Sequence, residues 1–223
     1  MVDPVFDRAV DDAMSRYAGA ARLALGMMRG KLRVDPVYRE LLDRGILAAP
    51  RVVDLGCGRG LLLSLILAAG ESGARPALFG IEIDPSATRA ASRALGGAAT
   101  IVEGDLAEEP IPPCDVVTLL DVAHYLPVAV QDALLDRVRA ALSPGGRLFL
   151  READAAAGVG FLAVRAAERL AALARGDGFR RFAYRSAAAW SRRLETGGFS
   201  VAAMPMGRGT PFANVLLEAR VPA

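Results

Sequence analysis

The sequence predicts an α/β fold: a doubly wound, mostly parallel seven-stranded sheet with a terminal antiparallel hairpin and an N-terminal helical cap. Three observations support this prediction. Apolar, β-branched stretches alternate with helical patterns between residues 51 and 152, as right-handed βαβ units require. The first of these stretches continues directly into three alternate glycines and a helix. The last two stretches of the chain are separated by a linker too short for a crossover helix, so we expect them to be antiparallel neighbours.

Composition excludes several classes of protein. The 223 residues suffice for one large domain or a core domain with a small appendage. The 27 basic and 25 acidic residues leave a net charge of +2, which predicts no nucleic-acid partner. Cys57, Cys114 and His124 are too few for a disulfide framework or a metal centre, so we expect no metal. We expect a reduced, cytoplasmic protein, because no signal-peptide pattern and no membrane-spanning apolar run is present.

Three helical patterns precede the first strand and form the predicted cap, residues 1–48. The first places its apolar residues on one stripe over residues 4–18. The second is the stretch LALGMM, and the third begins at Pro36 and ends at Gly45. We expect most of these residues to have only a structural role, in the core or on the surface, and no contact with a ligand. Those that could reach a ligand are Tyr17, Lys31, Arg33 and Tyr38.

The alternating region, residues 51–152, contains five short stretches rich in β-branched and apolar residues. They are RVVDL at 51–55, ALFGIEI at 77–83, ATIV at 99–102, DVVTLL at 115–120 and RLFLRE at 147–152. Helical patterns follow the first, second and fourth stretches. Asp84 is the expected cap of the second helix, and Pro127 opens the third, whose inner face includes Leu142. The sequence SPGG is expected to turn the chain into the fifth strand.

The pattern changes after residue 152. Residues 153–180 combine a flexible start with an amphipathic helix, which we interpret as a lid-like insertion over an active-site mouth. Residues 181–223 contain a helix capped by Ser186 and two strands, FSVAAMPM and FANVLLEARV. We expect residues 1–223 to form a single domain with residues 51–152 as its ligand-binding core.

Acidic residues and glycines stand at the ends of the first four predicted strands, where ligands bind in open parallel sheets. The glycines precede a helix start, whose free N–H groups suit a carboxylate or a phosphate. These positions are Asp54, Gly56, Gly58 and Gly60 after the first strand, Glu82 and Asp84 after the second, Asp105 after the third, and Asp121, His124 and Tyr125 after the fourth.

This ordered set resembles the class I S-adenosylmethionine-dependent methyltransferase family, in which an acidic strand end is followed by G-x-G-x-G. The dinucleotide fingerprint G-x-G-x-x-G has a different glycine spacing. The resemblance covers nearly all of residues 51–152, and the terminal hairpin is the methyltransferase variant of the doubly wound fold. It implies a methyltransferase with S-adenosyl-L-methionine as cofactor and S-adenosyl-L-homocysteine as product. The alternatives are a cofactor-binding subunit without catalysis and a nicotinamide-dependent oxidoreductase.

The resemblance implies that Glu82 holds both ribose hydroxyls, because one carboxylate can accept from two O–H donors. Asp84 is the alternative for that role, although we interpret it as a helix cap. Asp105 is expected to accept from the adenine amine, with Leu106 packing on the ring. The complete set of expected cofactor positions is Asp54, Gly56, Cys57, Gly58, Glu82, Ile83, Asp105, Leu106 and Asp121.

The glycine loop has further implied roles. Gly56 and Gly58 let the backbone approach the methionine portion of the cofactor, and the helix start favours its carboxylate. Asp54 is expected to order the loop, and Cys57 lacks a base partner and is expected to be a small filler. Asp121 has two open roles: orienting the cofactor's amino group, or facing the acceptor.

The expected acceptor pocket is apolar and aromatic, and its candidates are Tyr17, Tyr125, Phe161, Phe179 and Tyr184. A small or carrier-tethered hydrophobic acceptor, methylated at oxygen or at carbon, fits it better than RNA, DNA or a protein tail. The segments GKLRVDPVY and TPFANVLLEA are similar to segments of methyltransferases of bacterial polyene-pigment and polyketide pathways. A homodimer is an open alternative to a single chain.

Methyl transfer from a sulfonium mainly requires alignment of donor and nucleophile and exclusion of water. A general base is needed only where the acceptor must lose a proton. His124 is the candidate base because its imidazole follows the fourth strand by a few residues. The alternative is that it only orders its turn by packing.

Overall fold

The computed structural model describes residues 3–70, 76–158, 160–162, 164, 166, 182–207 and 213–223. The chain forms two compact units, Met1–Val116 and Val117–Ala223, and each is described by itself. Among the described residues, no helix combines the length and the apolar character that a membrane crossing needs.

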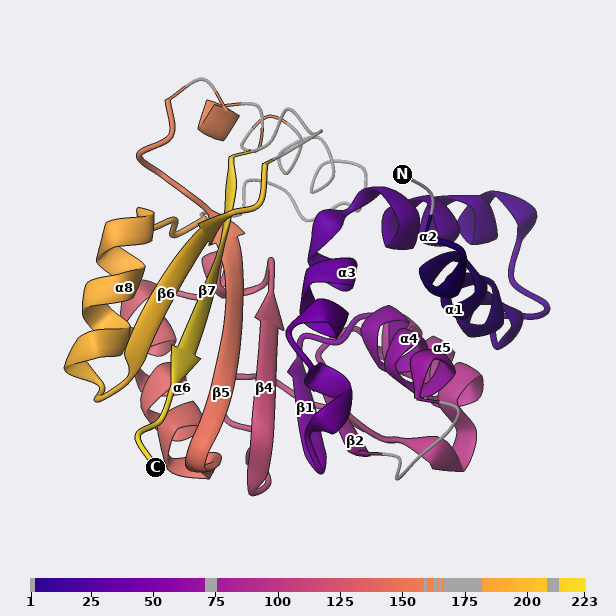
Figure 1. Cartoon of the computed structure of the whole chain (residues 1–223), viewed down its shortest axis with the longest axis horizontal. Helices are drawn as coiled ribbons and strands as arrows, with labels where there is room; N and C mark the ends of the chain where they lie inside the picture. The colour runs from indigo at the N-terminus through magenta and orange to yellow at the C-terminus, as the bar shows by residue number, and fades with distance from the viewer. Residues whose placement is uncertain are drawn as a thin grey trace. The chain divides into compact units, whose positions relative to one another are not determined.

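The N-terminal cap consists of three helices, as predicted: α1 (Pro4–Ser15), α2 (Arg22–Val34) and α3 (Pro36–Asp43). Asp3 and Asp35 cap α1 and α3 by accepting backbone N–H bonds, and a proline follows each cap. Gly45 ends α3 with a φ of 71°, a conformation that favours glycine. The buried face of α1 packs on α4 (Leu61–Ala69), so the cap belongs to the first unit (Figure 1).

The rest of the first unit alternates strands with helices. Its parallel strands are β1 (Arg51–Leu55), β2 (Ala77–Glu82) and β3 (Thr100–Glu103), with 3-10 turns η1 (Ile46–Ala48) and η2 (Gly96–Ala98). Seven of the nine residues of α4 are buried, which explains why its sequence is apolar on all sides. Asp84 caps α5 (Pro85–Leu95) through a 2.7 Å bond from the Ser86 N–H, as expected.

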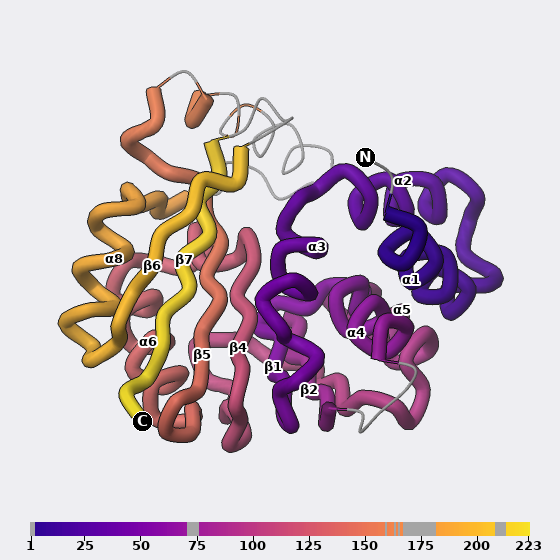
Figure 2. The backbone as a smooth tube through the Cα atoms, in the orientation of Figure 1, coloured from indigo at the N-terminus to yellow at the C-terminus, as the bar shows by residue number. Residues whose placement is uncertain are grey.

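The second unit contains the predicted terminal hairpin. Its elements are η3 (Ala123–Tyr125), α6 (Val128–Ala141), β5 (Leu142–Ala153), α8 (Ala187–Thr196), β6 (Ser200–Pro205) and β7 (Asn214–Arg220). β7 pairs antiparallel with both β5 and β6, and Figure 2 shows β6 and β7 side by side. Ser186 caps α8, whose Trp190 and Leu194 are fully buried.

β5 corrects one expectation. It begins at Leu142, so the sequence SPGG lies within the strand and Leu142 is not on a helix. The physical reason is a partner distant in the sequence. The Gly145 N–H donates to the Pro222 carbonyl, and the Val221 N–H donates to the Gly146 carbonyl. The C-terminal residues thereby extend the pairing past the expected turn.

The strands, with β4 (Cys114–Leu120), hydrogen-bond in the order β3-β2-β1-β4-β5-β7-β6. This mostly parallel seven-stranded sheet with antiparallel C-terminal strands confirms the predicted fold class. Most of the predicted lid-like insertion, residues 153–180, lies outside the described residues. Its role as a lid and the expected single domain stay predictions.

Candidate active site

The three glycines after β1 all adopt the left-handed backbone conformation, with φ of 71° at Gly56, 56° at Gly58 and 76° at Gly60. A Cβ at Gly60 would also lie 2.9 Å from Leu95 Cδ1 and 3.2 Å from Ala91 Cβ. At Gly58 no atom lies within 4 Å of such a Cβ. Gly60 is therefore required by both backbone and packing, and Gly58 by backbone alone.

Backbone hydrogen bonds hold this glycine loop against the end of β2. The N–H groups of Gly56 and Cys57 donate to the Ile81 carbonyl at 2.8 and 3.0 Å. The Gly60 N–H donates to the Cys57 carbonyl at 2.9 Å, which closes the turn before α4. The loop is thus formed by the protein's own bonds, with the first N–H groups of α4 beside it.

The Glu82 carboxylate joins the glycine loop to the start of α5. Its Oε2 accepts from the Gly58 N–H at 2.8 Å, and its Oε1 accepts from the Asp84 N–H at 2.9 Å. A carboxylate offers about four acceptor sites, so these bonds leave capacity for two ribose hydroxyls. The carboxylate of Asp84 is engaged in capping α5. Of the two acids, Glu82 therefore fits the ribose better.

The positions expected to hold adenine follow β2 and β3. Ile83 is 57% exposed and presents apolar surface directly after Glu82. Leu106 is buried. Asp105 Oδ1 accepts from the Ala107 N–H at 2.8 Å and so shapes the turn after β3, whereas Oδ2 is not part of this bond. An exposed apolar side chain after β2 and a carboxylate after β3 suit a flat ring that carries an amine.

Asp54 and Cys57 are both buried at the start of the loop. Burial, followed by the charges of Asp54 and Glu82, raises the pKa of the Cys57 thiol far above its usual range. The thiol therefore stays protonated at neutral pH and is a poor nucleophile. A Cβ at Gly80 would lie 2.7 Å from Cys57 Sγ, so the sulfur packs directly over this glycine of β2.

Tyr17 contacts the glycine loop, which the sequence did not indicate. Its hydroxyl donates to the Arg59 carbonyl at 2.8 Å and lies 2.9 Å from Ser64 Oγ. Desolvation by burial raises the pKa of Tyr17 to about 12. Its expected place in the acceptor pocket stays a prediction.

The other cap residues that could reach a ligand differ in their surroundings. Arg33 forms ion pairs with Asp11 at 3.0 Å and with Asp7 at 3.3 Å, both on α1. Tyr38 is buried and Lys31 is exposed. Arg33 thus ties α2 to α1.

In the second unit, His124 and Glu152 form a buried pair with 3% and 1% exposure. His124 Nδ1 lies 2.7 Å from Glu152 Oε2, and the His124 backbone N–H donates to Oε1 at 3.2 Å. An ionised carboxylate only accepts, so the pair places a hydrogen on Nδ1 and leaves Nε2 as the basic ring nitrogen. The sequence did not single out Glu152. The available signal was the charged pair Arg151-Glu152 closing an apolar strand.

Aromatic rings surround the His124 imidazole in the second unit. Among the described residues, three ring centroids lie near its own: Tyr125 at 4.3 Å, Tyr184 at 5.0 Å and Phe182 at 5.7 Å. Tyr184 stacks on the imidazole with an interplanar angle of 15°, and Phe161 packs edge-on against Tyr184. Three predicted pocket residues thus gather near His124, and Phe182 joins them. Phe179 lies outside the described residues.

Gln131 fixes the segment that carries two of these rings. It is 1% exposed, and its Nε2 lies 3.0 Å from the carbonyls of Ala123 and Leu126 and 2.7 Å from that of Ala183. The Ala183 N–H donates to the His124 carbonyl at 2.8 Å. The sequence did not predict this clamp, because its partners lie far apart along the chain.

Asp121 adopts a φ of 58°, a conformation uncommon for a residue with a side chain. Its carboxylate forms a two-point ion pair with Arg151, with Nε 2.9 Å from Oδ1 and Nη2 bonded to Oδ2. Arg151 is 3% exposed, and its carbonyl accepts from the Asp121 N–H at 2.9 Å. The sequence did not predict Arg151. Both roles considered for Asp121 stay open.

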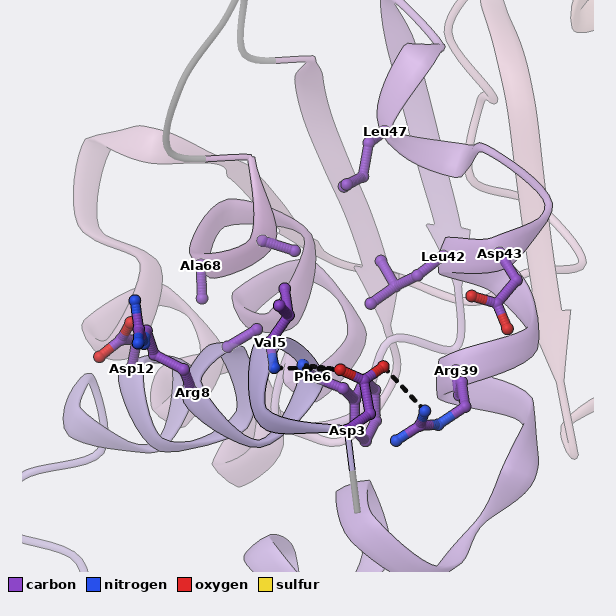
Figure 3. A pocket seen from close by; sticks show the side chains of 12 residues that line it. Asp3, Val5, Phe6, Arg8, Asp12, Arg39, Leu42, Asp43, Leu47 and Ala68 are labelled. Carbon is purple, nitrogen blue, oxygen red and sulfur yellow. Dashed lines mark hydrogen bonds and ion pairs between the residues drawn. The ribbon is translucent and has the colours of Figure 1, made fainter. Parts of the chain in front are cut away.

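A cavity of about 340 Å³ lies elsewhere in the first unit, between α1, α3 and α4 (Figure 3). Asp3 and Arg39, which both line it, form an ion pair 2.9 Å long. Its apolar lining includes Val5, Leu42, Leu47 and Ala68. None of the expected cofactor positions lines this cavity.

The chain is similar in sequence to known methyltransferases. A family model described as a methyltransferase domain matches residues 27–203. Trans-aconitate 2-methyltransferase from Methylobacterium nodulans is 38% identical over 117 residues, which cover 52% of this chain and 43% of that protein. Demethylspheroidene O-methyltransferase from Rhodobacter capsulatus is 35% identical over 108 residues, which cover 48% and 26%. The chain spans about half the length, or less, of the curated relatives it matches.

The fold also matches solved structures. Magnesium protoporphyrin IX methyltransferase from Synechocystis, solved with bound SAH, superposes with a TM-score of 0.62 at 22% identity and covers 97% of this chain and 96% of that one. At this identity the likeness shows the fold alone.

Proposed function

The chain belongs to the S-adenosylmethionine-dependent methyltransferases, and from this membership we propose that it transfers the cofactor's methyl group to an oxygen atom of a small or carrier-tethered hydrophobic acceptor. The observation that carries oxygen as the acceptor atom is the buried pair of His124 and Glu152. A hydroxyl must lose its proton to become a good nucleophile, and a positioned imidazole can take it.

On the cofactor side, S-adenosylmethionine supplies a methyl group activated by its sulfonium. The start of α4 and the glycine loop bind the cofactor's carboxylate through backbone N–H groups. Glu82 accepts from the ribose hydroxyls with the acceptor capacity that Gly58 and Asp84 leave over. Ile83 and Leu106 pack on the adenine, and Asp105 accepts from its amine.

On the acceptor side, Glu152 holds the hydrogen on His124 Nδ1, and Nε2 takes the proton of the acceptor hydroxyl. The buried carboxylate then stabilises the imidazolium that forms. The second contact of Glu152, with the His124 backbone N–H, fixes the loop that carries the imidazole. Glu152 therefore orients the base in the way that a third residue orients histidine in other acid–base sites.

The rings of Tyr125, Tyr184 and Phe182 support an apolar or aromatic acceptor. They offer stacking surface and few charges, which matches a hydrophobic molecule better than a nucleic acid. The name of the demethylspheroidene relative includes O-methyl transfer, which supports oxygen as the acceptor atom. An activity screen can identify which class of hydroxylated molecule is the acceptor.

The test is formation of S-adenosylhomocysteine with phenols, hydroxylated acyl compounds and carboxylic acids as acceptors. Hydroxyl acceptors should give turnover that falls at least about a hundredfold in His124→Gln, with cofactor affinity unchanged. Tyr125→Phe is the matched control, because it keeps the neighbouring ring, removes only its hydroxyl and leaves the base. A loss below about tenfold in His124→Gln would show that alignment alone carries the reaction. Turnover with carboxylic acids alone would also remove the need for a base, since they are already ionised at neutral pH.

A further inference from the structure

We propose that Tyr17 is a positioning residue for the cofactor's amino-acid end: its hydroxyl fixes the Arg59–Gly60 peptide beside the start of α4. This inference deepens the cofactor-binding part of the proposed function and rests on it. Tyr17 lies two residues after the end of α1 in the cap, and Arg59 lies 42 positions further along the chain. The cap would therefore complete the cofactor site from outside the core.

The donor and the acceptor are defined in the hydrogen bond between Tyr17 and Arg59. A carbonyl only accepts, so the phenol donates its hydrogen to the Arg59 oxygen at 2.8 Å. The Ser64 hydroxyl, 2.9 Å away, is then the donor to the phenol oxygen. Ser64 lies in α4, is fully buried, and donates its own N–H to the Gly60 carbonyl at 2.9 Å. Tyr17 thus joins the end of the loop to the first turns of α4.

These contacts hold the Arg59–Gly60 peptide at both ends. Its carbonyl oxygen accepts from Tyr17, and its N–H donates to the Cys57 carbonyl at 2.9 Å. A peptide is planar, so fixing both groups fixes the orientation of the unit. This peptide leads directly into α4, whose first N–H groups have no intrahelical acceptor. These are the donors available to the carboxylate of the cofactor.

The burial of Tyr17 makes this contact persistent. Tyr17 is only 6% exposed, and desolvation by burial raises the pKa of its hydroxyl to about 12. The hydroxyl therefore keeps its hydrogen throughout the neutral range and remains a donor to Arg59. Loss of the hydroxyl would leave the Arg59 carbonyl in a part-buried place without this partner, and the peptide would be freer to rotate.

The test compares two ligands on wild-type protein and on Tyr17→Phe by calorimetry. S-adenosylhomocysteine carries the carboxylate that the loop is proposed to bind, whereas adenosine lacks it. We expect the dissociation constant for S-adenosylhomocysteine to rise about tenfold in Tyr17→Phe, the loss typical of one hydrogen bond. The constant for adenosine should change less than about twofold.

The outcomes separate the possible explanations. Equal weakening of both ligands would overturn the proposal, since it would mean a general structural role for Tyr17. Unchanged binding of S-adenosylhomocysteine would overturn it as well. Adenosine binding also reports whether the variant is folded at the site. Failure of wild-type protein to bind either ligand would instead contradict the proposed function.

Discussion

Glu82→Ala is the substitution that most fully tests the cofactor site. The carboxylate accepts two backbone N–H bonds, from Gly58 at 2.8 Å and from Asp84 at 2.9 Å, and we expect it to accept two ribose hydroxyls in addition. Alanine removes all four interactions. The substitution should therefore weaken the loop in the free protein and weaken cofactor binding more strongly.

The magnitudes differ for the two effects. Hydrogen bonds to a charged group are worth about 1.5–3 kcal/mol, which predicts a dissociation constant raised roughly 10- to 150-fold. Glu82 is only half-buried, so water can replace it at the Gly58 and Asp84 N–H groups. We therefore expect a loss of unfolding free energy of only about 1 kcal/mol.

Calorimetric titration with adenosine and with 2′,3′-dideoxyadenosine isolates the ribose contribution. Glu82→Ala should weaken adenosine binding and leave the already weak binding of the dideoxy compound unchanged. Asp84→Asn is the control, because asparagine keeps the α5 cap and removes the competing carboxylate. Glu82 does not hold the ribose if Glu82→Ala binds adenosine as tightly as wild type, or if Asp84→Asn shows the larger loss.

The glycine loop, Glu152 and Tyr17 each allow a separate test. Gly60→Ala should destabilise the protein more than Gly58→Ala in urea unfolding, because both carry a positive φ but only Gly60 faces Leu95 at 2.9 Å; equal losses would contradict this. Glu152→Gln should reduce turnover of hydroxyl acceptors at least about a hundredfold without changing cofactor affinity, and an unaffected rate would exclude the orienting role. The pKa of Tyr17 is raised from 10.0 to about 12 in the folded state, so the unfolded chain loses this proton first. Stability should therefore fall as pH rises from about 10 to 12, and it should fall less in Tyr17→Phe; identical alkaline profiles would contradict this.

Most of the fold could be predicted because its signals are local. The apolar stretches, the caps at Asp84 and Ser186, and the short linker before β7 each depend on a few neighbouring residues. The start of β5 could not be predicted in the same way. The bonds from Gly145 to Pro222 and from Val221 to Gly146 join segments far apart in the sequence.

In the candidate site, too, some residues could be predicted from the sequence and others could not. The spacing of Glu82 and the glycines predicts that they lie together, because the ends of parallel strands meet at one edge of a sheet, and the Gly58 N–H does donate to Glu82. Glu152 and Arg151 were missed, because their partners His124 and Asp121 are set by strand register and not by sequence distance. Tyr17 was expected near the acceptor because it is aromatic. Its hydroxyl, which makes the contact with Arg59, has no signature in the local sequence.

The proposed function depends on binding of S-adenosylmethionine through the glycine loop and Glu82. Calorimetric titration of the wild-type protein with S-adenosylhomocysteine, and separately with NAD, tests it most directly. We expect saturable binding of one S-adenosylhomocysteine per chain and no binding of NAD, as the glycine spacing predicts. Binding of NAD without binding of S-adenosylhomocysteine would contradict it.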